Sequence, residues 1–352
     1  MTRSEKISVF DPNSPGEPGS SLFGLPFDAS EAQVVVVPVP WDVTVSYRDG
    51  ASRGPEAILA ASVQVDLFDP SVPDAWKIGL AMDDISEEVR GRAVRLRESA
   101  RSYIDAITTG IDPVSVAASD GIRDAVNEGS AWLNAWVEAR CRHWLEHGKL
   151  IALVGGDHST PYGLLKALAS AGEPFGILQI DAHADLRDAY EGFVFSHASI
   201  MRNALEMPEV SHLVQVGIRD YCQEEADFIA GDARVTSFFD RDLKHAQYAG
   251  GTWAEQVHTI VERLPKRVYV SFDIDGLDPK LCPHTGTPVP GGLEFEQALY
   301  LIEHVARSGR TIIGCDVNEV APGPNDSEWD ANVGARLLFR LCNLMAASNG
   351  RA

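Results

Sequence analysis

Residues 175–185 read FGILQIDAHAD, a continuous apolar run followed at once by Asp181, His183 and Asp185 at every second position. A short apolar run of this kind is typical of a buried strand in a parallel sheet. In extended backbone, residues two apart point to the same side, so the three side chains are expected to face one point. Carboxylate and imidazole groups that converge in this way predict a metal site where the strand ends.

The same alternation of apolar runs and helical patterns extends along most of the chain. Strands are predicted at 33–39, 150–155, 175–181, 212–217, 267–275 and 311–317. Helices are predicted near 124–147, 160–171, 198–206, 223–230, 253–264, 294–308 and 330–347. Continuous apolar strands separated by helices indicate an α/β fold with a mainly parallel sheet and helices on both faces.

Two segments fit this pattern less well. Proline and glycine gather in DPNSPGEPGSS (11–21), so residues 1–30 are interpreted as an extension or arm before a single domain, residues 31–352. Segment 84–123 is charged and weakly patterned, with a helix expected only over 87–104. The role of both segments stays open at this point.

Composition narrows the class of protein and its partners. The 352 residues are 45% apolar, which is enough for a large core. With 30 basic and 51 acidic residues, the formal net charge is 30 − 51 = −21. This charge disfavours nucleic acid and anionic membrane surfaces as partners and favours a cationic substrate. No apolar run reaches the roughly 18 residues of a membrane span, and MTRSEKISVF lacks the apolar segment of a signal peptide. A cytoplasmic protein is therefore expected.

The five cysteines are scattered and never spaced as C-x-x-C. This spacing indicates neither a disulfide framework nor a zinc ribbon. They are interpreted as buried free thiols in a reducing compartment. They are Cys141, Cys222, Cys282, Cys315 and Cys342.

Two more predicted strands run into metal-ligand residues. GGDHST (155–160) brings His158 after one strand, and DIDGLDP (273–279) brings Asp273 and Asp275 after another. Parallel strands collect their ligands at their carboxyl ends, so these residues are expected near the first three. Any one of them could be a cap or a satisfied core polar group. Nothing structural calls for so many acids at three strand ends.

The donor set narrows the kind of metal centre. Two imidazoles and four carboxylates are too many for one catalytic zinc and too rich in oxygen for a structural zinc. Two divalent ions fit better, because four carboxylates balance their charge and paired ions activate water at neutral pH. Manganese suits such ligands best, although nickel, cobalt or zinc could occupy them. The candidate metal ligands are His158, Asp181, His183, Asp185, Asp273 and Asp275.

Five motifs together resemble the ureohydrolase family of arginases, agmatinases and related guanidino hydrolases. They are GGDHST (155–160), DAHAD (181–185), SFDIDGLDP (271–279), TGTPVPGG (285–292) and DVNEVAP (316–322). The resemblance extends from VPVPWDVTVSYRDGASRGPEAI (37–58) to the C-terminal helix. It implies a three-layer α/β/α arginase-like fold and a homo-oligomer, a trimer or hexamer. It leaves open an accessory protein that loads the metal.

The resemblance also implies roles for individual residues. One ion would be held by His158, Asp181, Asp185 and Asp273, and the other by Asp181, His183, Asp273 and Asp275. Three residues would be catalytic. Asp185 would help to relay a proton, His197 in FSHAS would shuttle it to the departing amine, and Glu319 in DVNEVAP would pair with the guanidinium.

The loop LRDAYEGFVFS (186–196) lacks the arginase pattern that holds the amino-acid end of arginine. The resemblance therefore points to the agmatinase branch, with hydrolysis of agmatine or a similar small guanidino compound to urea and an amine. The main alternative is a nickel-dependent guanidine hydrolase that yields urea and ammonia. Hydrolases of guanidinobutyrate, guanidinopropionate and formiminoglutamate are further alternatives. Two other classes are a metal-binding but inactive subunit and a single-zinc, deacetylase-like amidohydrolase.

Two contrasting expectations concern the space around the end of the substrate that lies away from its guanidino group. An extended cation would meet acidic residues of the 186–196 loop and of the segment WDVTVSYRDG (41–50). If aromatic residues closed that space, only guanidine would fit. The acids are Asp42, Asp49, Asp188 and Glu191, and the aromatic residues are Trp41, Tyr47 and Phe193.

Overall fold

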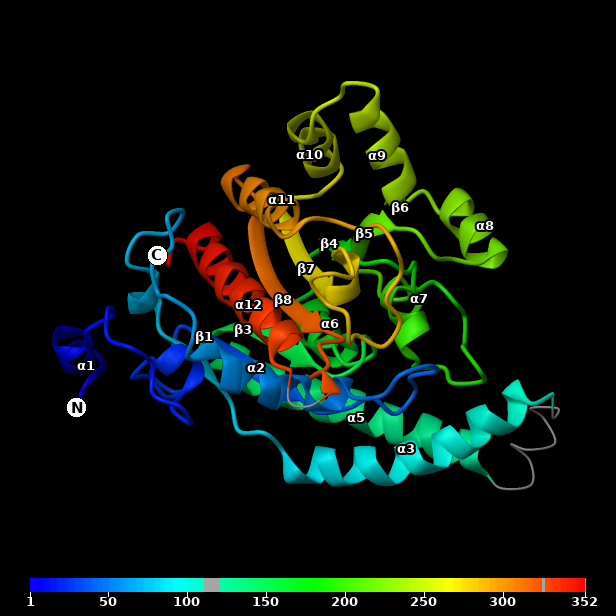
Figure 1. The fold of residues 1–352 in the computed structure, drawn as a ribbon, viewed down its shortest axis with the longest axis horizontal. Coiled ribbons are helices and arrows are strands. Elements are labelled where there is room, and N and C mark those ends of the chain that lie inside the picture. Colours follow the sequence, from blue (N-terminus) through cyan, green and yellow to red (C-terminus); the bar gives the residue numbers. More distant parts are fainter. Residues whose placement is uncertain (111–120, 325–326, 352) are drawn as a thin grey trace.

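The computed structural model describes residues 1–110, 121–324 and 327–351. Eight strands form one sheet in the order β2-β1-β3-β8-β7-β4-β5-β6 (Figure 1). All the strand pairs recorded in it are parallel. The strands are β1 (Val34–Val39), β2 (Leu80–Met82), β3 (Leu150–Gly155), β4 (Phe175–Ile180), β5 (Val210–Ile218), β6 (Val235–Phe239), β7 (Arg267–Asp273) and β8 (Thr311–Asn318).

Helices cover both faces of this sheet. Along β3, Leu150, Ala152 and Val154 join a core with α2 and α9 to α12, whereas Ile151 and Leu153 join a core with α3, α5, α6 and α7. This alternation follows from the two-residue period of a strand. The fold is therefore the expected three-layer α/β/α arrangement. The helices are α1 (Arg3–Val9), α2 (Gly54–Ser62), α3 (Glu87–Thr108), α5 (Ile122–Glu146), α6 (Tyr162–Ala169), α7 (Ile200–Ala204), α8 (Gln223–Gly231), α9 (Asp240–Tyr248), α10 (Trp253–Glu262), α11 (Phe295–Arg307) and α12 (Trp329–Ser348).

The six predicted strands and seven predicted helices are confirmed in position. Both edge strands, β2 and β6, and the helices α1, α2 and α9 were not predicted from the sequence. β2 has three residues, and four of the five residues of β6 are only half-buried. Neither strand therefore carries the continuous apolar run that marks a central strand. In the described part of the chain, no helix is long and apolar enough to cross a membrane.

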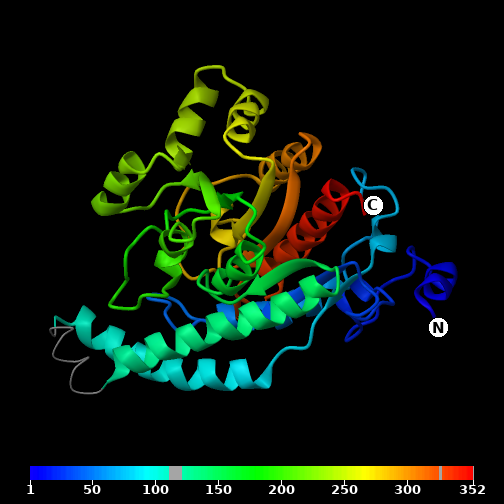
Figure 2. The ribbon, with the colours of Figure 1, turned by 180° about the vertical axis from the view of Figure 1, so that it is seen from behind.

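The charged segment 84–123 contributes a long helix. α3 packs along α5, and the two lie side by side in both views (Figures 1 and 2). Val89, Ala93, Ala100 and Tyr103 of α3 are buried, although five arginines interrupt its apolar face in the sequence. No helix or strand was predicted after residue 104 of this segment. Within that part, residues 111–120 lie outside the described residues.

The five cysteines only partly match their interpretation as buried free thiols. All five are free in the structure, and four of them are buried. Cys222 is half-buried, because it precedes α8 at the edge of the domain.

The last part of the segment 1–30 packs into the core of the domain, whereas none of residues 1–21 is buried. Leu22, Phe23, Leu25 and Phe27 are buried in the core that contains α2 and α12. The ring of Phe23 meets that of Phe339 edge to face, with ring centroids 5.1 Å apart. Apolar residues in a turn-rich stretch follow neither the helical nor the strand period, so the pattern does not reveal this packing. The boundary after residue 30 stays a prediction.

This packing predicts a large loss of stability for Phe27→Ala. The Phe27 side chain is 3% exposed, and removing a buried phenylalanine typically costs about 3–5 kcal/mol of unfolding free energy. Phe68→Ala is the matched control, because Phe68 is 82% exposed. Urea unfolding of both variants checks the expectation. Equal midpoints would contradict the packing of residues 22–27 into the core.

Candidate metal centre

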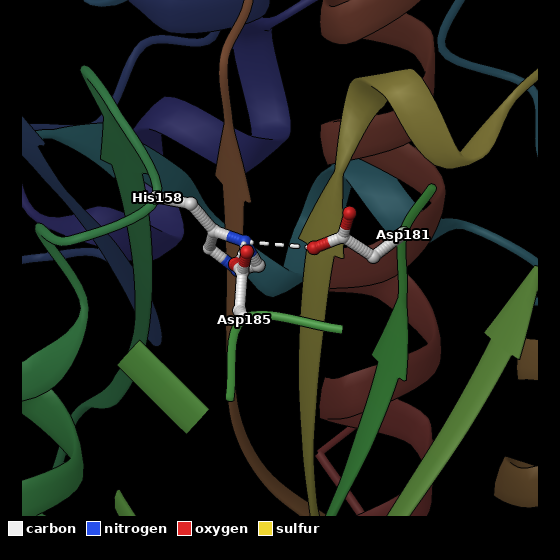
Figure 3. Close-up of side chains that lie close together, drawn as sticks. All are labelled: His158, Asp181 and Asp185. Carbon is white, nitrogen blue, oxygen red and sulfur yellow. Dashed lines mark ion pairs between the residues drawn. The ribbon is translucent and has the colours of Figure 1, made fainter. Parts of the chain in front are cut away.

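Three strand ends bring the candidate ligands together. His158 follows β3, Asp181 and Asp185 follow β4, and the three side chains point toward one another (Figure 3). The Nδ1 atom of His158 lies 2.9 Å from a carboxylate oxygen of each of these two residues. It lies 3.5 Å from an oxygen of Asp273, the last residue of β7. The carboxyl ends of β3, β4 and β7 in the middle of the sheet thus bring the ligands together at one edge, as the parallel topology favours.

The ligands do not converge for the expected reason. β4 ends at Ile180, so Asp181, His183 and Asp185 lie in the loop beyond it and not in extended strand. Asp185 has φ 55°, a left-handed conformation that costs free energy in a residue with a side chain. Asp275 likewise lies beyond its strand, in the 3-10 turn η5 (Ile274–Gly276). The prediction that side-chain alternation aligns these residues is therefore wrong for the loop, although the site that it located is present.

Asp181 is shared between two groups of ligand atoms. One group contains His158, Asp181 and Asp185, and the other contains Asp181, His183 and Asp275. One oxygen of Asp181 lies 2.9 Å from His158 Nδ1, and the other lies 3.6 Å from His183 Nδ1. The carboxylate therefore faces both groups, as a bridging ligand of two ions would.

The orientation of His158 fits a metal ligand. Its Nε2 lies 2.9 Å from the Ser271 hydroxyl oxygen, and that hydroxyl donates to Asp316 at 3.1 Å. A proton on Nε2 leaves the Nδ1 lone pair facing the carboxylates. Nδ1 is buried and has no hydrogen-bond partner among the described residues. A divalent ion would supply the partner that this nitrogen lacks.

The pKa values indicate that the buried carboxylates repel one another and that a cation between them would be favourable. Burial and then the Asp181 charge raise the pKa of Asp185 to about 7. Burial, followed by repulsion from Asp275 and Asp181, raises the pKa of Asp273 well above its usual range. Burial also acts on Asp181, but the adjacent His158 and His183 imidazoles hold its pKa low. Positive charge at this point would relieve the repulsion, so the residues present fit a pair of divalent ions.

The two remaining candidate catalytic residues flank the cluster. His197 begins the 3-10 turn η4 (His197–Ser199) and lines a cavity of about 450 Å³ together with His183 and Asp185. Glu319 follows β8 with φ 61°, and its carboxylate accepts a hydrogen bond of 2.9 Å from the His158 backbone N–H. Burial, followed by the Asp157 charge, raises the pKa of Glu319 well above its usual range. Glu319 is 6% exposed and is not among the residues that line this cavity.

Of the three aromatic residues expected to close the cavity, Tyr47 alone is among its lining residues. Tyr47, Tyr190, Tyr221, Arg48, Arg187 and Asp220 line it. Trp41 and Phe193 are fully buried in the core, so neither closes the space. No residue of the segment 1–30 lines the cavity, so this segment does not cap the site.

The four acids expected near the substrate's far end lie elsewhere. Asp42 is buried and accepts the backbone N–H groups of Gly50 and Ser52, so it braces a loop. Asp42 and Asp49 line a separate cavity of about 830 Å³ against α3. Asp188 and Glu191 are not among the residues that line the smaller cavity. Proximity along the sequence did not predict the direction of these side chains.

Several supporting residues were missed. Ser271 orients His158, and the Gln179 side-chain amide donates to Asp181 at 2.8 Å and to the His183 carbonyl at 3.2 Å. Both are polar residues inside apolar strand runs, as is Asp316 in β8. A polar side chain in a buried strand needs a hydrogen-bond partner. A polar residue within an apolar run of the sequence could therefore have indicated these supporting residues.

Comparisons with known proteins agree with this geometry. A family model described as the arginase family matches residues 32–343. An N(1)-aminopropylagmatine ureohydrolase from Thermus thermophilus is 34% identical over 325 residues, which is 91% of this chain and 92% of the relative. The enzyme of that name from Synechocystis is 31% identical over 315 residues, 89% of both chains.

More distant relatives share the fold. The agmatinase of Bacillus subtilis is 28% identical over 321 residues, 88% of this chain and 90% of the relative. The crystal structure of the agmatine ureohydrolase of Thermoplasma volcanium superposes with a TM-score of 0.70 at 24% identity, covering 99% of both chains. The chain belongs to the arginase family and is a ureohydrolase of the agmatinase branch, which cleaves a guanidino compound.

Proposed function

We propose that the protein hydrolyses a guanidino compound with an extended cationic tail, such as agmatine or N(1)-aminopropylagmatine, to urea and an amine. The observation that carries the proposal is the open cavity of about 450 Å³ beside His183, Asp185 and His197. This volume lies in the usual range for small-molecule sites. Guanidine, with its four heavy atoms, would leave most of it empty. The names of the three enzymes compared above, two N(1)-aminopropylagmatine ureohydrolases and an agmatinase, support the same choice.

The charged residues that line the cavity favour a substrate with a cationic tail, although Arg48 favours an anionic tail. Asp220 is exposed, and no ion pair among the described residues engages its carboxylate. Arg187 stacks on the Tyr190 ring at 4.8 Å and lies 3.9 Å from Glu225, so its charge is partly offset. Arg48 is exposed and is the group that an anionic tail would use. A guanidino acid such as guanidinobutyrate is therefore the second candidate.

The metal ions would be held as the ligand groups indicate. His158, Asp181 and Asp185 would hold one ion, and Asp181, His183 and Asp275 the other. Asp273 belongs to neither group, but it lies 3.5 Å from His158 Nδ1, and we propose it as a further ligand of both ions, as the resemblance implies. When bound, two divalent ions supply the Lewis acidity that lowers the pKa of water. We propose Mn²⁺ as the native metal, with Ni²⁺ as the alternative, because both accept carboxylate and imidazole ligands. The expected trimer or hexamer and the accessory protein stay predictions.

The chain's own residues would complete the reaction. Burial lowers the pKa of His197 to about 3, so its imidazole is neutral at pH 7 and can accept a proton before donating it to the departing amine. Glu319 would accept hydrogen bonds from the guanidinium N–H groups and orient its carbon. Asp185 would hold the proton released when water attacks. The charged residues thus divide orientation and proton transfer between them.

The variant Asp220→Asn tests whether the Asp220 carboxylate binds the cationic tail of the substrate. We expect the variant to raise the KM for agmatine about 5- to 10-fold, since the loss of one charge-assisted contact is worth about 1–1.5 kcal/mol. The KM for guanidinobutyrate should stay constant or fall. Asp188→Asn is the control, because Asp188 is an exposed acid on the neighbouring loop but does not line the cavity.

The assay measures urea release by protein reconstituted separately with Mn²⁺ and Ni²⁺. The substrates are agmatine, N(1)-aminopropylagmatine, guanidinobutyrate, guanidinopropionate, guanidine and arginine. If guanidine alone is turned over, the protein is a guanidine hydrolase and the proposed substrate is wrong. If a guanidino acid is preferred and Arg48→Gln abolishes that preference, the substrate is a guanidino acid instead.

A further inference from the structure

We propose that Thr44 and Asp157 are positioning residues that hold the His197 imidazole with its Nε2 atom toward the substrate cavity. The inference rests on the proposed role of His197 as a proton shuttle. Thr44 lies in the loop after β1 and is fully buried, as is Asp157. Neither residue belongs to the candidate metal ligands or lines the substrate cavity.

The Thr44 hydroxyl joins His197 to Asp157. Its oxygen accepts the His197 backbone N–H at 3.3 Å and lies 3.5 Å from the imidazole Nδ1. The hydroxyl donates to Asp157 Oδ2 at 3.4 Å. A threonine has one O–H to give, so once it donates to the carboxylate it can only accept from Nδ1. With Nδ1 as the donor to this oxygen, the proton of neutral His197 lies on Nδ1 and the Nε2 lone pair is free.

Asp157 can serve only as an acceptor toward Thr44. Its other oxygen, Oδ1, accepts both the Ser159 hydroxyl and the Ser159 backbone N–H. The carboxylate is therefore fixed by two donors, with Oδ2 turned to Thr44. When His197 carries an extra proton, this buried carboxylate stabilises the imidazolium through the hydroxyl.

The loop that carries Thr44 is held on both sides. Arg97 of α3 donates to the backbone carbonyls of Val43 and Val45, which flank Thr44, at 3.2 and 2.6 Å. The backbone N–H of Asp157 donates to the Trp41 carbonyl at 2.7 Å. A Cβ at Gly156 would lie 1.7 Å from that carbonyl oxygen, so the loop and the β3 end are in direct contact. Such fixed surroundings are what a positioning group needs.

Two other groups adjoin the imidazole. The Ser196 hydroxyl oxygen lies 3.3 Å from Nδ1 and accepts the Ala198 backbone N–H at 3.3 Å. The Tyr190 ring meets the His197 ring edge to face, with centroids 6.0 Å apart. Neither contact links the imidazole to a carboxylate. The Thr44 hydroxyl does so, and for this reason its loss should affect proton transfer more than the loss of the Ser196 hydroxyl.

A double-mutant cycle tests the proposal on the metal-reconstituted enzyme. Thr44→Val keeps the branched shape and removes the hydroxyl, and we expect kcat to fall about 10- to 100-fold, the range for residues that orient an active group. The KM should change less than twofold and the metal content not at all. Thr44→Ser should restore most of the rate. In the His197→Ala background, Thr44→Val should have no further effect on kcat, because the group that it positions is gone.

The controls separate the inference from general damage. Ser62→Ala removes another buried hydroxyl, which accepts the Phe23 backbone N–H at 2.9 Å, and should leave kcat unchanged. Ser196→Ala should lower kcat less than Thr44→Val. The inference is overturned if Thr44→Val lowers kcat by the same factor with and without His197, if Thr44→Ser is as slow as Thr44→Val, or if metal is lost. An unchanged rate in His197→Ala would instead remove the proposed shuttle itself, and this inference with it.

Discussion

His183→Ala is expected to bind at most one divalent ion per chain and to lose at least about 10³-fold in kcat. His183 and Asp275 belong to one of the two ligand groups, with His183 Nδ1 3.1 Å from an Asp275 oxygen. Removing the imidazole leaves that group with carboxylates alone. Lewis-acid stabilisation by one ion is worth several kcal/mol of transition-state free energy, which corresponds to this loss of rate. Metal analysis by mass spectrometry and urea release measure the two effects.

The fold of this variant should persist. The His183 side chain is 24% exposed, so its removal leaves little unfilled space in the core. His212→Ala is the matched control, since His212 is exposed and its ring contacts only the Ser211 hydroxyl among the recorded hydrogen bonds. Two ions bound at full strength in His183→Ala would rule out the assignment of this ligand group.

His197→Ala should lower kcat by about 10²–10⁴-fold, the usual contribution of one general acid or base. The variant should keep both ions, because His197 belongs to neither ligand group. The loss should be smaller for substrates whose departing amine is less basic, since such an amine needs a proton less. Added imidazole should restore part of the rate by entering the space that the side chain leaves. A rate equal to that of the unmodified enzyme would mean that another residue or water protonates the amine.

The central part of the fold could be predicted because its strands are buried on both faces. Such strands show continuous apolar runs, for example LIALVG in β3, and their order along the chain indicates a parallel sheet. The edge strand β6 has the sequence VTSFF, is half exposed and gives no such signal. The packing of residues 22–27 depends on α12, at the opposite end of the chain, which a local pattern does not contain.

The convergence of the candidate ligands was predictable, but its geometry was not. The residue types at three strand ends indicated a cation, and the resemblance to the ureohydrolase motifs assigned their roles. The loop conformations of Asp185 and Glu319, both at positive φ, depend on contacts that form only in the folded chain. The contact between Thr44 and His197 spans 153 residues of sequence. No spacing rule connects a loop after the first strand with a histidine so far along the chain.

The position of β8 in the sheet has a consequence for the order of folding. β8 is the last strand in the sequence, yet it lies between β3 and β7. During synthesis, the half of the sheet with β1 and β3 cannot join the half with β4 and β7 until residues 311–318 leave the ribosome. His158 follows a strand of the first half, and Asp181 follows a strand of the second. The ligand group of His158, Asp181 and Asp185 therefore stays incomplete in the nascent chain until translation has nearly ended. The other group, Asp181, His183 and Asp275, lies wholly in the second half and can form earlier.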